Sequence, residues 1–335
     1  MTQHYPRLRP RGVLPHQREQ GERLLAREVI HFAFYLPQDH VDLATAVAHA
    51  FDCYVQAVGE GPATFNSCAF GSAAHSPLTP ERWSHLRQLL LPDRPFRYAE
   101  DCTNEHRLRE MEKSGHETWI HLGGPLGELT GFKLTYSARI PSRDRAPSDA
   151  DVSYLEGTLT TEYLEEHGPA RVRKLALDLA SGLPFATGHM GLSFDSLLGD
   201  VFFTPRLREE LLRYPGLSLH HGSPPGWMGS RVEGVHWLNF LGPPVLAELG
   251  GVAALRSRLS SPETNVQELD AGRAVVTLGA WPEAGDLAQG NKLLSYRELA
   301  QVLEPWLDEP FNDPAFRMEG FARDEALRWA RRFLD

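Results

Sequence analysis

Cysteine is scarce in this sequence, which has only three such residues in 335: Cys53, Cys68 and Cys102. They are odd in number and widely spaced, and no C-x-x-C pair occurs, which argues against both a disulfide framework and a zinc knuckle. Cys53 falls on a helical pattern as a small core residue, whereas Cys68 and Cys102 fall near expected loops. So little cysteine is typical of a reducing compartment, and we expect a cytoplasmic protein.

Long apolar runs are absent as well. No stretch approaches the roughly 18 consecutive apolar residues that a membrane helix needs. The beginning of the chain, HYPRLRPRGVLPHQREQ, is polar and interrupted by proline, so it lacks the apolar region of a signal peptide. We therefore expect neither a membrane anchor nor a membrane partner.

Motifs that carry chemistry are also missing. The sequence contains no His-Glu-x-x-His metal motif and no Gly-x-Ser-x-Gly nucleophile turn. The glycine-rich stretch 222–231 lacks the Lys-Ser/Thr ending of a phosphate loop, and its prolines remove backbone donors. No catalytic residue, metal ligand or cofactor is therefore predicted.

Histidine, by contrast, is plentiful, with 15 residues, so metal binding has to be considered. His220 and His221 are adjacent, and on a regular element their side chains would point apart. His31, His49 and His236 lie within apolar elements, where a core or edge position is the more frequent role. A metal- or histidine-dependent hydrolase remains the alternative if the chain is an enzyme.

Charge is distributed unevenly along the chain. Residues 1–27 hold six arginines against two glutamates, whereas the remaining residues carry 28 basic and 42 acidic side chains, a net charge of −14. Such an acidic body repels nucleic acid and anionic membranes, and it suits a basic protein partner. Acidity of this kind also serves simply to keep a protein in solution. We interpret 1–27 as a basic extension and 28–335 as the folded domain.

Periodic apolar positions predict an α+β fold. Strands are expected at 28–36, 131–140, 152–164 and 185–194, and a hairpin at 265–279. Helices are expected at about 42–58, after Thr79-Pro80 and Thr204-Pro205, at about 169–181, before Pro305, and at about 324–334. Hairpins interrupted by helices, without a strict β-α-β-α rhythm, indicate largely antiparallel sheets covered by helices.

Two stretches have a role in organising this fold. PSRDRAPSDAD (141–151) is rich in proline, serine and charge; it is interpreted as a long hairpin loop, or as the boundary if the chain has two lobes. VHWLNFLGPPVLAELGG (235–251) predicts a strand, a turn at Gly242, a helix beginning at the two following prolines, and a left-handed stop at Gly250. Every residue of the second stretch has a packing or turning role, so it is a scaffold that performs no chemistry.

Acidic residues gather at several places, where solvated faces and helix caps are their usual role. WPEAGD (281–286) differs because it follows the hairpin and combines an aromatic anchor, Trp281, with Glu283 and Asp286. Trp227 is a second candidate anchor, although a tryptophan folded onto the core is the commoner case. The candidate contact residues also include three acids of TEYLEEHG: Glu162, Glu165 and Glu166.

Several segments together resemble a known family. RYPGL (213–217), GVHWLNFLGPPVLAELGG (234–251), GRAVVTLGAWPEAGD (272–286) and YRELAQVLEPWL (296–307) are similar, in this order, to the type VI secretion immunity family. The resemblance runs from about residue 28 to about 308 and is strongest over 204–308. It does not include the basic extension or the last helix.

The resemblance implies a specific role. Members of the family are antidotes encoded beside toxic effectors, including nucleases, and they protect the producer and its kin by binding the toxin. The resemblance implies no enzymatic activity, and it carries over no contact residue because no family motif fixes one. We therefore expect an immunity protein that neutralises a cognate antibacterial toxin by stoichiometric binding. The alternatives are the hydrolase above and an adaptor of the secretion machinery.

Overall fold

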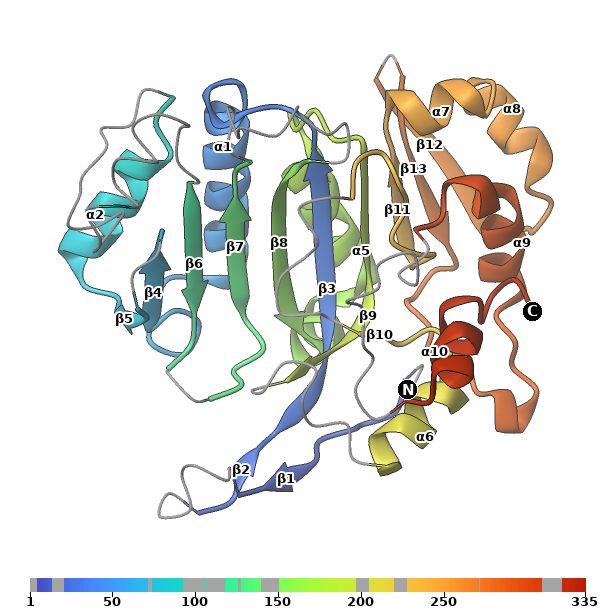
Figure 1. Cartoon of the computed structure of the whole chain (residues 1–335), viewed down its shortest axis with the longest axis horizontal. Coiled ribbons are helices and arrows are strands. Elements are labelled where there is room, and N and C mark those ends of the chain that lie inside the picture. Colours follow the sequence, from blue (N-terminus) through green and yellow to red (C-terminus); the bar gives the residue numbers. More distant parts are fainter. Residues whose placement is uncertain are drawn as a thin grey trace. The chain divides into compact units, whose positions relative to one another are not determined.

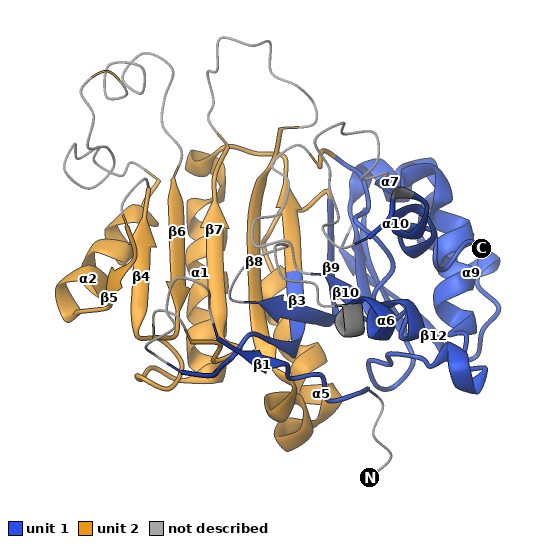
Figure 2. Cartoon of the chain, turned by 60° about the horizontal axis from the view of Figure 1, so that its bottom comes forward, with its two compact units in different colours: residues 1–32, 187–224, 230–335 blue, residues 33–186, 225–229 orange. Residues whose placement is uncertain are grey.

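The computed structural model describes residues 5–13, 21–71, 74–92, 106, 118–125, 128–139, 151–196, 205–219, 228–270, 272–308 and 321–335. Within them the chain has the expected α+β fold, with an eleven-stranded, largely antiparallel sheet and accompanying helices (Figure 1). The chain divides into two compact units (Figure 2). Unit 1 comprises 1–32, 187–224 and 230–335, and unit 2 comprises 33–186 and 225–229.

Unit 2 is built on five antiparallel strands in the hydrogen-bonded order β8-β7-β6-β4-β5. Two helices, α1 and α5, pack against each other and lie behind these strands in Figure 1. The elements are α1 (His40–Val58), β4 (Ser67–Phe70), β5 (Ser76–Pro77), α2 (Pro80–Leu89), β6 (Trp119–Gly123), β7 (Lys133–Ser137), β8 (Ser153–Thr160) and α5 (Thr161–Ala180). Residues 141–150, expected as a loop or a boundary, lie outside the described residues, and β7 and β8 on either side pair within unit 2.

The helices of unit 2 begin where the sequence predicts, with one correction. The Thr79 hydroxyl accepts a hydrogen bond from the Arg82 amide (3.3 Å) and Pro80 opens α2, as expected. The strand expected over 152–164 is wrong beyond Thr160, whose hydroxyl accepts from the Tyr163 amide (3.0 Å) and caps α5 instead. Gly168, at φ 76°, then kinks α5. Three acidic candidates therefore lie on an exposed helical turn: Glu162, Glu165 and Glu166.

Unit 1 contains the antiparallel strands β9, β11, β13 and β12, which pair in that order. Its elements are β1 (Arg11–Gly12), β2 (Arg23–Leu24), β9 (Thr187–Ser196), α6 (Pro205–Arg213), β10 (Ser218–Leu219), β11 (Leu238–Leu241), α7 (Pro243–Glu248), α8 (Gly251–Arg258), β12 (Thr264–Asp270), β13 (Arg273–Leu278), η3 (Leu287–Gln289), α9 (Leu294–Leu303), η4 (Glu304–Trp306) and α10 (Arg323–Ala330). The predicted hairpin is β12–β13, and the helix before Pro305 ends at Leu303, as expected. Helices α7, α8 and α9 bury leucines and valines against β11 and β13 in one apolar core.

The strand, turn and capped helix expected at 235–251 are present in unit 1. Gly242 precedes α7, and Gly250 adopts a left-handed conformation (φ 86°) at its end, as predicted. The paired strand begins three residues later than expected because the Asn239 side chain folds back on His236. Its amide oxygen accepts from the His236 amide (2.9 Å), and its amide nitrogen donates to the His236 carbonyl (2.7 Å).

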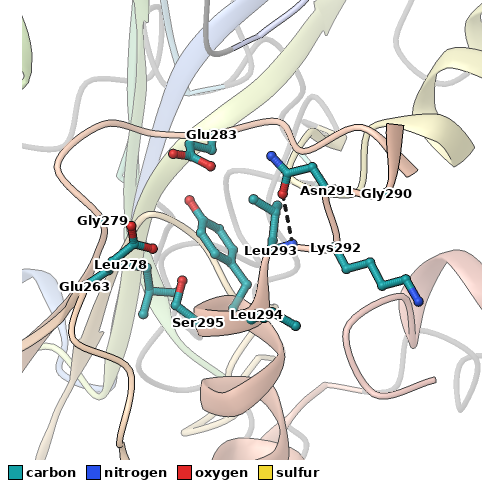
Figure 3. Close-up of a pocket in the computed structure, with 11 residues that line it drawn as sticks. Glu263, Leu278, Gly279, Glu283, Gly290, Asn291, Lys292, Leu293, Leu294 and Ser295 are labelled. Carbon is teal, nitrogen blue, oxygen red and sulfur yellow. Dashed lines mark hydrogen bonds between the residues drawn. The ribbon is translucent and has the colours of Figure 1, made fainter. Parts of the chain in front are cut away.

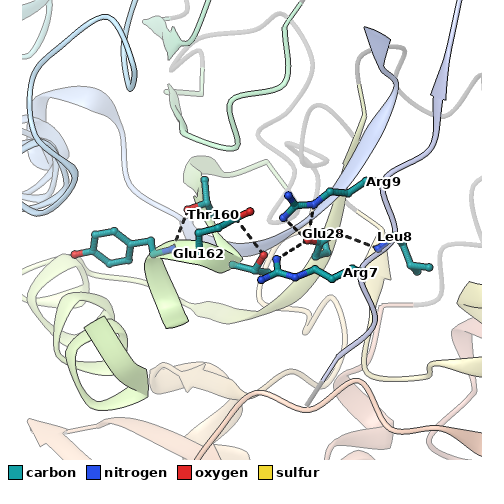
Figure 4. A network of polar contacts seen from close by, with 8 residues as sticks. Arg7, Leu8, Arg9, Glu28, Thr160 and Glu162 are labelled. Atoms are coloured by element: carbon teal, nitrogen blue, oxygen red, sulfur yellow. Dashed lines mark hydrogen bonds and ion pairs between the residues drawn. The ribbon is translucent and has the colours of Figure 1, made fainter. Parts of the chain in front are cut away.

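The basic segment at the beginning of the chain has a structural role in unit 1. Strand β3 (Ala26–Leu36), in which the two units meet in sequence, buries Glu28 completely. Arg7 donates one hydrogen bond to Glu28 (2.8 Å), Arg9 donates two (3.0 Å and 2.7 Å), and the Leu8 amide adds a fourth (3.1 Å; Figure 4). Burial alone would raise the pKa of Glu28, but these arginines lower it overall. Two of the six arginines thus neutralise a buried acid.

Two expected positions differ from the structure. His49, expected within an apolar element, is exposed on α1, next to Cys53. Cys68, expected near a loop, is a fully buried residue of β4, while Cys102 lies outside the described residues. None of the described helices is long and apolar enough to cross a membrane.

Candidate functional site

The loop WPEAGD (281–286) leaves the β12–β13 hairpin through a fixed turn. Gly279 adopts φ 79°, which allows the chain to turn directly after β13. The Trp237 indole donates to the Gly279 carbonyl (3.2 Å), and the Leu278 amide donates to the Trp237 carbonyl (2.8 Å). The stretch 235–251, through Trp237, therefore holds the base of this loop.

Asp286 ties the far end of the loop to helix α6. Arg213 donates two parallel hydrogen bonds to its carboxylate (2.9 Å and 2.7 Å). The same carboxylate accepts from the Ala288 amide (3.0 Å) and the Gln289 side chain (2.8 Å), which caps the short helix η3. The Arg213 hydrogen bonds are the main cause that lowers the pKa of Asp286 to about 2. Asp286 is thus a clamp that fixes the loop.

Gly216 supports the middle of the loop from beneath. Its amide donates to the Ala284 carbonyl (2.8 Å). A Cβ atom at this position would lie 2.1 Å from the Glu283 carbonyl oxygen, so only glycine permits the approach. The RYPGL segment therefore supports the WPEAGD loop through Arg213 and Gly216.

A pocket of about 450 Å³ lies beside the supported loop (Figure 3). Its walls come from the entrance to β12, the end of β13, the loop and the first residues of α9: Glu263, Leu278, Gly279, Glu283, Gly290, Asn291, Lys292, Leu293, Leu294, Ser295 and Tyr296. In Figure 3 the carboxylates of Glu263 and Glu283 lie at the pocket, whereas the Lys292 ammonium points away from it. The Tyr296 hydroxyl is hydrogen-bonded to the Glu283 backbone, and burial raises its pKa.

The rim of this pocket exposes a large apolar side chain, because Leu294, the first residue of α9, lines the pocket and is 75% exposed. Leu287 of η3, earlier in the chain, is 41% exposed. Between them Leu293 has a left-handed backbone (φ 50°), the one such non-glycine residue among those described. A left-handed leucine costs roughly 1–2 kcal/mol. Strain of this kind occurs where a structure holds side chains for binding.

The predicted contact residues differ in their burial and in the unit to which they belong. Glu283 is half-buried and lines the pocket, and Trp281 is half-buried in the same loop, whereas Asp286 is buried by its structural partners. Trp227 lies outside the described residues. The acids of α5 belong to unit 2, whereas the loop belongs to unit 1.

Sequence reasoning missed Glu263 and Leu294 as parts of this site. The hairpin contained a signal for Glu263, because the register pairs Thr264 with Leu278 and so brings Glu263 close to the loop. For Leu294 no signal was available. The pair Leu293-Leu294 opens an amphipathic helix, and only the fold decides which leucine is buried.

Three of the histidines form a buried cluster in unit 1. His189 lies 3.3 Å from His31 between ring nitrogens, and its ring stacks on that of His236 with centroids 3.9 Å apart. Burial lowers the pKa of His189 and of His236, so both rings are neutral near pH 7. Within the described part of the chain, no group of three or more His, Cys, Asp or Glu side chains is arranged to hold a metal ion.

Comparisons with known proteins identify a family and a similar fold. A family model described as type VI immunity for VRR-NUC matches residues 46–333. Among solved structures, the T6SS protein PA0821 of Pseudomonas aeruginosa has a TM-score of 0.66 and 20% sequence identity, covering 97% of this chain and 87% of that one. At this identity the likeness establishes the fold alone. No curated protein matches.

Proposed function

Since this chain belongs to the family of type VI immunity proteins for VRR-NUC, we propose that it neutralises its cognate nuclease effector by binding it stoichiometrically. The observation that carries the proposal is the family match over residues 46–333. The chain is an immunity protein against a VRR-NUC nuclease effector, and this family implies no enzymatic activity. The cytoplasm is where such an antidote would protect the nucleic acid of the producing cell.

Charge favours this mode of action. A nuclease presents a basic surface to the phosphate backbone of its substrate. The 308 residues after the basic extension carry a net charge of −14, so the two proteins attract each other before contact. Affinity then requires a few anchors that lose their water within a polar rim.

We assign the anchors to the loop and pocket of unit 1. Trp281 and Glu283 lie there on a backbone that Asp286, Arg213 and Gly216 hold in place. A loop that is already ordered loses little conformational entropy on binding, which favours affinity. The second candidate surface is the acidic turn of α5, and Trp227 is a further candidate anchor.

The test is co-expression of this chain with the effector encoded beside it. Survival of the cells, a complex of both proteins on gel filtration, and loss of nuclease activity at a one-to-one ratio are the expected results. If the effector kills equally well with and without this chain, and no complex forms, the proposal is wrong.

Two sets of variants separate the candidate surfaces. Trp281→Ala removes the loop anchor, and the triple change Glu162→Lys, Glu165→Lys and Glu166→Lys reverses the charge of the α5 turn. We expect Trp281→Ala to weaken binding about tenfold or more, as anchor residues at interfaces do. If only the α5 variant loses binding, the loop is not the contact surface.

A further inference from the structure

The pocket beside the loop has the chemistry of a receptor for a basic side chain. We propose that it receives an arginine or lysine of the nuclease effector between Glu263 and Glu283, with Leu294 as the apolar contact at its rim. The proposal rests on the proposed function and specifies the partner surface that this site recognises. The occupant is thus a protruding cationic side chain next to an apolar patch.

The charges of the pocket favour a cation. Glu263 and Glu283 bring two carboxylates to its wall, and the Lys292 ammonium points away from it (Figure 3). The N-terminus of α9 also opens on the pocket, but a helix end contributes only about half of a positive charge. Two full negative charges outweigh that partial charge, so a guanidinium or ammonium is attracted and an anion is not.

The space is suitable for such an occupant. A volume of about 450 Å³ lies within the roughly 300–1,000 Å³ that pockets for small ligands have. A long basic side chain fills part of this volume, and the polar residues Ser295 and Asn291 line the remaining space, where bridging water is a common feature of interfaces. A planar guanidinium carries several fixed donors that match the geometry of carboxylates, which makes arginine the better fit.

The rim supplies the apolar contact. Leu294 is the most exposed of the large apolar side chains described, at 75%. The left-handed backbone of Leu293 buries that leucine (5% exposed) and directs the chain so that its neighbour remains outside. A large apolar side chain exposed to solvent beside a charged pocket matches the usual arrangement of an interface, in which an apolar anchor is surrounded by polar groups.

Binding to a catalytically inactive effector tests the proposal, with the full-length chain and isothermal titration calorimetry. The pocket variant is Glu263→Gln with Glu283→Gln, which keeps shape and removes charge. The rim variant is Leu294→Ser. We expect each to weaken binding at least tenfold, and the pocket variant to reduce the salt dependence of the affinity.

Matched controls separate this effect from general charge or folding. Glu268→Gln removes an exposed charge from β12, and Leu327→Ser removes an exposed leucine from α10; both should bind within about twofold of wild type. Unchanged melting temperatures establish that the variants fold. If wild type binds and the pocket and rim variants bind equally well, the inference is wrong while the proposed function stands. If wild type itself does not bind, the proposed function fails.

Discussion

The Asp286 carboxylate fixes the loop 281–286 to helix α6 by accepting two hydrogen bonds from Arg213. Arg213 lowers the pKa of Asp286 to about 2, below the value of about 3.9 in an unfolded chain. A carboxyl with a lowered folded-state pKa stabilises the fold fully above about pH 4, and this contribution is lost as the pH falls toward 2. The ion pair between Asp286 and Arg213 therefore anchors the loop more weakly as the pH falls below about 4.

The substitution Asp286→Asn removes the charge that Arg213 binds. We expect the variant to melt at a lower temperature than wild type at pH 7, and the gap to narrow as the pH falls from 5 to 3. Thermal unfolding at several pH values measures it, with Asp324→Asn, on an exposed helical turn, as the control that leaves the melting temperature unchanged. A gap of the same size at every pH would contradict the assigned role.

Gly216 is the second residue on which the loop depends. In Gly216→Ala the new Cβ would lie 2.1 Å from the Glu283 carbonyl oxygen, so the loop has to move. We expect the free energy of unfolding to fall by about 1–3 kcal/mol and the affinity for the effector to fall with it. Urea unfolding and calorimetry measure these effects. Gly61→Ala is the control, since no heavy atom lies within 4 Å of its Cβ position, and an equal loss in both variants would refute the explanation.

At the scale of elements, the kink in α5 decides where the acidic turn is presented. Gly168 has φ 76° and ψ 161°, a backbone conformation that residues other than glycine rarely adopt. We expect Gly168→Ala to lower the free energy of unfolding by about 1–3 kcal/mol, measured by urea unfolding. Glu166→Ala, on the exposed surface two residues earlier, should change stability little. Equal stability of Gly168→Ala and wild type would show that the kink is not required.

The family segments also acquire a meaning at this scale. RYPGL ends α6 and supports the loop, WLNFLGPP forms β11 and holds the turn at Gly279, and YRELAQVLEPWL builds α9 beside the pocket. These segments are far apart in sequence, yet each of them contributes to the surroundings of WPEAGD. The physical link between these segments is that each of them supports the same loop.

At the scale of the whole molecule, the charge distribution makes a kinetic prediction. Since the body is acidic and a nuclease surface is basic, we expect the association rate to fall at least tenfold between about 50 and 300 mM salt, as steered association does. The dissociation rate should change much less. Surface plasmon resonance measures both. An association rate that does not respond to salt would mean that long-range charge has no part in capture.

The fold class, most element boundaries and the family could all be predicted from short-range patterns in the sequence. Apolar periodicity, capping threonines and turn glycines act over a few residues, so α1, α2, the β12–β13 hairpin and the stop at Gly250 could be predicted. The strand prediction over 152–164 was wrong beyond Thr160 because the alternation of VSYLEGTLTTEYL continues through Thr160, which caps the helix α5 instead.

The side chains that make the candidate site are brought together by long-range packing. Asp286 is a clamp because the fold brings Arg213, which is 73 residues away in the sequence, to 2.7 Å from its carboxylate. Glu263 and Leu294 joined the pocket because hairpin register and helix entry bring them to one place. Local patterns contain no information about such distant pairs, since the burial and charge of each side chain depend on what the rest of the fold packs against it.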